Sequence, residues 1–221
     1  MASPQLSSYQ QALWLDADLM IDLDVPDPLP GVDPDKVSMV LEMGSFFSRQ
    51  PEWFRTTWRS IESISMQTRW GVDVPQGWEG AYALWGVPSS QRPLFNTGVI
   101  AFSPARHRQV FLDIYTRWLD GGLGSLHEMI PLNLVLQQLN LCAELPEFYN
   151  RLVGVMFAVF QRQPHQMERW LGWSQRDTSL LTLIDGLRQT PAFLHFAGAH
   201  MLMRRYLSGQ EQLCSESEVS F

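Results

Sequence analysis

Two carboxylates stand two residues apart near the start of the chain, in the segment Leu13-Trp14-Leu15-Asp16-Ala17-Asp18. The apolar residues ahead of Asp16 predict a strand, and side chains two residues apart in a strand lie on one face. At the end of such a strand the pair would project beyond the sheet, where oxygen ligands can hold a hard divalent cation. A cation held this way commonly neutralises a polyphosphate. The alternative is a strand that ends in a solvated acidic turn.

The rest of the chain predicts strands that alternate with helices. We expect strands at 11–21, 37–41, 94–102 and 192–196, a short strand and turn at 144–150, and helices at 52–66, 104–119, 128–139 and 178–189. The apolar run within residues 151–176 fits a helix or a buried strand equally well. This alternation is typical of a single α/β domain. Its core is expected over 11–200, with 201–221 as a tail.

The composition sets limits on the class of protein. Among 221 residues, 45% are hydrophobic and 18% are charged, which is typical of a globular protein. A net charge of −7 argues against a nucleic-acid groove. The longest apolar run, Leu152 to Phe160, is too short to span a bilayer, and the first residues do not form a secretory signal. Two cysteines far apart fit a reduced setting, so we expect a soluble cytoplasmic protein without a transmembrane segment.

Three further motifs follow the Asp-x-Asp pair. They are Phe95-Asn96-Thr97-Gly98-Val99; Glu128-Met129-Ile130-Pro131-Leu132-Asn133 with Leu145-Pro146 and Tyr149-Asn150; and His195-Phe196-Ala197-Gly198. Together, and in this order, the four motifs resemble those of GT-A-fold glycosyltransferases, most closely the family 8 group that uses nucleotide-sugar donors. The resemblance covers about residues 11–200, and it implies a GT-A-like mixed sheet flanked by helices.

The resemblance also implies roles for residues that match the motifs. The metal ligands would be Asp16, Asp18 and His195, which suit Mn²⁺ or Mg²⁺. The catalytic residues would be Glu128 and Asn96, beside the donor sugar or the transferred carbon. The donor, a nucleoside-diphosphate sugar and most simply a UDP-sugar, would contact Asn96, Thr97, Gly98 and Gly198. An acceptor of unknown identity would contact Trp78, Tyr82 and Asn150.

Each of these residues also has a purely structural interpretation. A histidine after an apolar strand is commonly a satisfied core residue, and Asn96 could bridge backbone groups at the strand entrance. Glu128 could be a carboxylate that the helix dipole favours at a helix N-terminus. The aromatic residues between 70 and 85 could pack under a loop instead of stacking on a sugar.

Two departures from the family pattern leave a second function open. Only fifteen residues precede Asp16, so the strands that bind base and ribose in the family are expected to be missing. Met201 stands where the family has a phosphate-binding lysine. The alternative is therefore a truncated or degenerate remnant of the fold that acts as a binding or assembly module.

A third class, the haloacid-dehalogenase-type phosphatases, also begins with Asp-x-Asp after an apolar strand. That chemistry needs Thr or Val two residues after the second aspartate and a lysine further on. Met20 occupies the first place, and the sole lysine, Lys36, lies in a proline-rich turn. These residues exclude the phosphatase.

Overall fold

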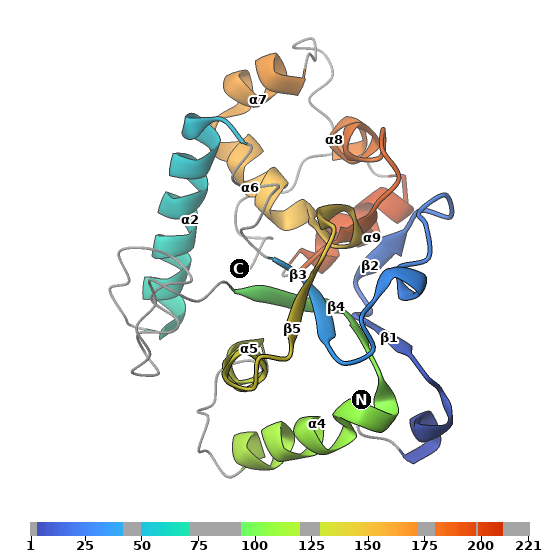
Figure 1. Cartoon of the computed structure of the whole chain (residues 1–221). Helices are drawn as coiled ribbons and strands as arrows, with labels where there is room; N and C mark the ends of the chain where they lie inside the picture. The colour runs from blue at the N-terminus through green and yellow to red at the C-terminus, as the bar shows by residue number, and fades with distance from the viewer. Residues whose placement is uncertain are drawn as a thin grey trace. The chain divides into compact units, whose positions relative to one another are not determined.

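The structure is a computed structural model of the chain (Figure 1), and it describes residues 4–41, 50–70, 94–119, 129–171, 180–197 and 199–209. The chain divides into two compact units, which are described one at a time. The first comprises Met1–Asp16, Pro26–Phe46 and Trp78–Tyr149, and the second comprises Ala17–Val25, Phe47–Gly77 and Asn150–Phe221. The division falls inside the Asp-x-Asp motif, directly after Asp16.

The first unit contains a four-stranded mixed sheet in the strand order β1-β4-β3-β5 (Figure 1). The pairs β1–β4 and β3–β4 are antiparallel, and β5 runs parallel to β3. The strands are Ala12–Leu15 (β1), Val37–Leu41 (β3), Phe95–Phe102 (β4) and Cys142–Leu145 (β5). Because β4 lies between two strands, it is buried along its whole length. The strands expected at 37–41 and 94–102 are confirmed.

Two helices pack on one face of this sheet, α4 (Pro104–Leu119) and α5 (Met129–Gln138). Alternate residues of β3 and β4 point toward them, as the period of a strand requires. The Phe102 and Phe111 rings meet edge to face with centroids 5.1 Å apart, which joins β4 to α4. The buried cluster consists of Val37, Met39, Phe95, Ile100, Phe102, Phe111, Ile114, Leu132, Val135 and Leu136.

Short turns complete the described part of the first unit. They are the 3₁₀ segments η1 (Pro4–Ser8), η2 (Leu29–Gly31) and η4 (Glu147–Tyr149). After α5 the chain passes through Asn140, whose φ of 54° is in the left-handed region that asparagine tolerates better than most residues. The Lys36 ammonium donates to the Asn140 carbonyl and so satisfies it.

The second unit contains a three-stranded mixed sheet in the strand order β2-β7-β6. The strands are Leu19–Ile21 (β2), Arg151–Leu152 (β6) and Phe193–His195 (β7). β2 runs antiparallel to β7, with Leu19 opposite His195, whereas β6 runs parallel to β7, with Leu152 opposite His195. His195 therefore ends the central strand of this sheet and has a neighbouring strand on each side.

Helices form most of the described part of the second unit. They are α2 (Glu52–Trp70), α6 (Val153–Arg162), α7 (Pro164–Leu171), α8 (Leu180–Leu187) and α9 (His200–Leu207). Helix α6 is buried from Val153 through Phe160 and packs against α2, which buries Phe54, Trp58 and Ile61. The apolar run left open by the sequence is therefore a core helix.

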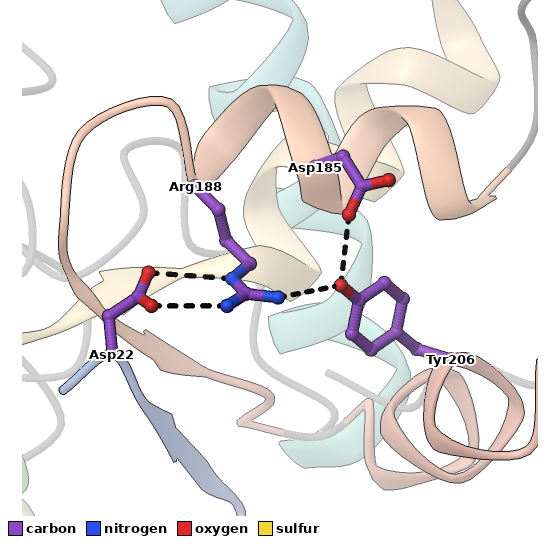
Figure 2. Close-up of polar contacts among 4 residues, drawn as sticks. All are labelled: Asp22, Asp185, Arg188 and Tyr206. Atoms are coloured by element: carbon purple, nitrogen blue, oxygen red, sulfur yellow. Dashed lines mark hydrogen bonds and ion pairs between the residues drawn. The ribbon is translucent and has the colours of Figure 1, made fainter.

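A polar network joins three elements of the second unit (Figure 2). The Arg188 guanidinium, just after α8, donates to both carboxylate oxygens of Asp22 at 3.1 and 3.4 Å. It also donates to the Tyr206 hydroxyl on α9 at 3.0 Å, and that hydroxyl donates to Asp185 on α8 at 2.9 Å. The network thus links the end of β2 to α8 and α9.

The mixed sheets and their helices confirm the α/β class, but one expected strand is wrong. Residues 11–21 do not form a single buried strand, because the chain changes sheets at the Asp-x-Asp motif. The Asp16 amide donates to the Gly98 carbonyl at the end of β1, and the Phe196 amide donates to the Asp18 carbonyl where β2 begins. Trp14, within β1, is 43% exposed.

Within the segment expected as a C-terminal tail, His200–Leu207 form helix α9. The boundaries of a single domain stay a prediction. Among the helices of the described residues, none combines the length and the apolar character needed to cross a membrane.

Candidate metal-binding site

Asp16 lies directly after β1 in the first unit. Its amide is fixed by the Gly98 carbonyl of β4 at 2.9 Å, and its carboxylate Oδ1 accepts a hydrogen bond from the Trp14 indole Nε1 at 3.1 Å. Trp14 and Asp16 are two residues apart, so both side chains leave the chain on the same side. The carboxylate of Asp16 is thus oriented by a neighbour on its own strand.

Asp18 and His195 meet within the second unit. The β2–β7 ladder places Leu19 opposite His195, which puts the residue before Leu19 at the end of β7. The Asp18 Oδ1 atom lies 3.3 Å from His195 Nε2. The His195 side chain is 4% exposed and that of Asp18 is 31% exposed, so a buried imidazole faces a partly solvated carboxylate.

The other ring nitrogen of His195 also has a partner. Its Nδ1 atom lies 2.8 Å from the Oδ1 atom of Asn150, and both residues are 3% exposed. Asn150 directly precedes β6, in which Arg151 and Leu152 pair with Leu194 and His195 of β7, and its side chain reaches the His195 ring. Both nitrogens of this imidazole are therefore engaged.

Asp18 and His195 each offer one ligand atom within the second unit, and Asp16 stands two residues before Asp18 in the sequence. Two carboxylates and one imidazole are a donor set that suits Mn²⁺ and other first-row divalent cations, and the carboxylates also suit Mg²⁺. The residues present therefore fit a divalent cation.

The surroundings of Asp18 keep it ionised. The hydrogen bond with His195 holds the pKa of the Asp18 carboxyl below its ordinary value, against the burial that acts in the opposite direction. The charge of His195, and more weakly that of His200, lowers this pKa further. A cation would thus meet an anionic oxygen at neutral pH.

Residues 96–98 form a buried irregularity in β4 beside Asp16. In the pairing of β3 with β4, Met39 lies opposite Ile100 and Val40 lies opposite Asn96, so residues 97–99 bulge between the two pairs. The Asn96 Oδ1 atom accepts the Gly98 amide at 2.8 Å and closes this bulge. The side-chain bridge considered for Asn96 is therefore present, and contact of Asn96, Thr97 and Gly98 with a donor stays a prediction.

Four other expected site residues lie outside the described residues: Glu128, Gly198, Trp78 and Tyr82. Asn150 is described, and contact with an acceptor stays a prediction for it.

Two contacts at the site are not among those predicted from the sequence, that of Asn150 with His195 and that of Trp14 with Asp16. The two-residue spacing of Trp14 and Asp16 on one strand face could have revealed the second contact. No spacing could have revealed the first, because the sheet topology creates it.

Comparison with solved structures finds glycosyltransferases that are similar to this chain at low sequence identity. One similar structure is the galactosyltransferase LgtC in complex with donor and acceptor sugar analogues, at 14% identity and a TM-score of 0.44. The match covers 96% of this chain and 67% of that one. Another is the bifunctional glycosyltransferase WbbM, at 14% identity and a TM-score of 0.39, with 87% and 29% of the two chains covered. No family model and no curated protein matches the chain. Neither TM-score is high enough to establish a common fold.

Proposed function

We propose that this chain is a metal-dependent glycosyltransferase that moves a sugar from a nucleoside-diphosphate sugar to an acceptor. The observation that carries the proposal is the contact of Asp18 with His195 inside the second unit, where Oδ1 and Nε2 lie 3.3 Å apart although the two residues are distant in sequence. These two residues, together with Asp16, are those that the ordered motifs assign to a metal. Chance contact of the second aspartate with the histidine of the fourth motif is a weaker explanation.

In this proposal the three side chains hold Mn²⁺ or Mg²⁺. A bound cation would neutralise the charge that develops on the nucleoside diphosphate as the glycosidic bond breaks. Asp18 contributes an anionic oxygen, because His195 keeps its pKa low. Asp16 contributes a second oxygen that the Trp14 indole orients.

The finer assignments belong to the same proposal. The donor is a UDP-sugar that contacts Asn96, Thr97, Gly98 and Gly198, and the catalytic roles toward the donor sugar or the transferred carbon are assigned to Glu128 and Asn96. Trp78, Tyr82 and Asn150 are assigned to the acceptor side. A cytoplasmic location is part of the same proposal, and it rests on the sequence alone.

Calorimetric titration with Mn²⁺ tests the metal site first. We expect the wild type to bind Mn²⁺ and Asp18→Asn to lose at least the roughly 10- to 100-fold affinity that a partner of a metal ligand can contribute. Asp113→Asn is the matched control, since Asp113 is an exposed aspartate on α4 that accepts a hydrogen bond from Gln109. Its Mn²⁺ affinity should equal that of the wild type. A wild type that binds no Mn²⁺ at millimolar concentration would refute the proposal.

A second experiment measures the release of nucleoside diphosphate from a panel of UDP-sugars. It distinguishes an enzyme from a non-catalytic binding module. Metal-dependent release that disappears in Asp18→Asn supports transfer or hydrolysis of the donor sugar. If the protein binds Mn²⁺ and a nucleotide sugar but releases no nucleoside diphosphate, the non-catalytic binding module is favoured. Met201, at the position of the family's phosphate-binding lysine, is one reason to consider that module.

A further inference from the structure

Asn150 occupies a place that the β6–β7 pairing fixes. The neighbouring Arg151 anchors β6 through its guanidinium, which donates to the Leu187 carbonyl at 2.6 Å and to the Thr190 hydroxyl at 3.2 Å. The Asn150 side chain is thereby held beside His195, with both residues 3% exposed. A hydrogen bond in such a buried setting is costly to lose, because either group would be left unsatisfied.

The identity of the Asn150 atom decides which nitrogen of His195 carries the proton. An amide oxygen only accepts hydrogen bonds, so the Nδ1 atom 2.8 Å from Asn150 Oδ1 must be the donor. In the neutral imidazole the lone pair is then on Nε2. That nitrogen lies 3.3 Å from Asp18 Oδ1, which is also an acceptor.

Nε2 and the Asp18 carboxylate then face each other as two acceptors, an arrangement that a shared cation would satisfy. Without the Asn150 contact the proton could instead move to Nε2 and donate to Asp18. That tautomer would hide the nitrogen that a metal needs.

We propose that Asn150 is a positioning residue that holds His195 in the Nδ1–H tautomer and so keeps Nε2 available toward Asp18. The inference rests on the proposed function only for the use of that nitrogen as a metal ligand. The same hydrogen bond also orients the ring, which a ligand histidine requires. Asn150 thus acts through His195, in addition to the acceptor contact predicted for it.

The tautomer can be read in the metal-free protein by nitrogen NMR of ¹⁵N-histidine, with His195→Gln used to assign the signal. The spectra are recorded over a range of alkaline pH, and the tautomer is read from the signals of the neutral ring, because only a neutral ring has one protonated and one unprotonated nitrogen. We expect wild-type His195 to show a protonated Nδ1 and an unprotonated Nε2. Asn150→Leu should move the proton to Nε2 or give a mixture, whereas Asn150→Asp, which keeps an acceptor oxygen, should restore the wild-type pattern.

Mn²⁺ calorimetry on the same variants gives the functional readout. Asn150→Leu should bind Mn²⁺ about 10- to 100-fold more weakly, and Asn150→Asp should recover most of that loss. Asn133→Leu is the matched control, because Asn133 is equally buried but hydrogen-bonds to the Phe95 backbone in the first unit. It should destabilise the fold without changing the His195 signal.

Several results would overturn the proposal. A wild-type His195 that carries its proton on Nε2 contradicts it directly, as would equal tautomers in the wild type and Asn150→Leu. A wild type that fails to bind Mn²⁺ would instead count against the proposed function, while the NMR result would still decide the role of Asn150. If Asn150→Leu does not fold, the wild-type spectrum and Asn150→Asp still carry the test.

Discussion

At the scale of single residues, the candidate metal site depends on side chains that hold the ligands as well as on the ligands themselves. Asn150 contacts the buried nitrogen of His195, and Trp14 contacts Asp16. The two contacts differ in exposure, since Asn150 is buried whereas Trp14 is 43% exposed. Solvent competes with the hydrogen bond of Trp14, so its contribution should be the smaller one.

Trp14→Phe tests this smaller contribution, because phenylalanine keeps an aromatic ring and removes the N–H that holds the Asp16 carboxylate. We expect Mn²⁺ affinity to fall by about 10-fold, the lower end of the range for partners of metal ligands. Calorimetry measures the change. Tyr115→Phe, at an exposed aromatic residue on α4, should leave the affinity unchanged. Equal affinities of Trp14→Phe and the wild type would show that the indole does not orient Asp16.

His107, at the start of α4, should make the free energy of unfolding depend on pH. It is 2% exposed, its Nδ1 accepts the Ser103 amide at 3.1 Å, and burial lowers its pKa below the ordinary value. As the pH falls below about 6.5, the unfolded chain binds a proton at this residue before the folded chain does. The stability that neutral His107 contributes is therefore complete above that pH and is lost as the pH falls toward the folded pKa.

Urea unfolding on both sides of pH 6.5 measures this effect. The free energy of unfolding should decrease less on acidification in His107→Gln than in the wild type. His165→Gln, at an exposed histidine on α7, is the control for replacing a histidine by glutamine. The same slope in His107→Gln and the wild type would contradict the assignment.

At the scale of elements, the polar network around Arg188 connects the end of β2 to α8 and α9 within the second unit (Figure 2). Arg188 is 40% exposed and Asp22 is 17% exposed, so water and salt weaken the ion pair between them. The guanidinium also holds the Tyr206 hydroxyl, which connects α9 to α8. The network should therefore contribute modestly to stability while fixing where three elements meet.

Arg188→Gln should lower the free energy of unfolding by about 1 kcal/mol, because a partly exposed bidentate pair and one further hydrogen bond are lost. Arg188→Lys should recover little, since an ammonium cannot reproduce the fork geometry. Arg204→Gln, at an exposed arginine on α9, is the control for loss of one positive charge. If Arg204→Gln destabilises the protein as much as Arg188→Gln does, charge and not geometry explains the effect.

At the scale of the molecule, the sequence predicts elements better than it predicts partners. The helix starting after Ser103 and the strand ending at Phe102 follow from local signals, a proline at the first turn and a continuous apolar run. Helix α6 could not be told from a strand because it is buried along its apolar length and shows no polar face.

The candidate site likewise has residues that the sequence predicts and contacts that it does not. Asp16, Asp18 and His195 were predicted from motif order, because chemistry restricts the residue types that can bind a metal. The break in the strand at 11–21 was not predicted, because the change of sheet depends on distant partners, Gly98 and Phe196. The motif resemblance predicts an acceptor contact for Asn150, and its contact with His195 is not predictable from the sequence because the two residues are distant in it.

Phe157 tests whether α6 is the core of the second unit. It is fully buried on a helix whose neighbours are also buried, so Phe157→Ala should cost about 3–5 kcal/mol through lost burial and the cavity left behind. Leu207→Ala, at a residue 64% exposed on α9, should change stability by less than about 0.5 kcal/mol. Denaturant unfolding measures both. A loss for Phe157→Ala as small as that control would place the core elsewhere.

The contact between Lys36 and the carbonyl of Asn140 has a practical consequence for labelling. Because no other side chain in the sequence carries a primary amine, an amine-selective fluorophore or cross-linker would attach to the side chain at one position, beside the turn that follows α5. Reductive methylation keeps the positive charge there, whereas acetylation removes it and leaves the carbonyl without its charged donor.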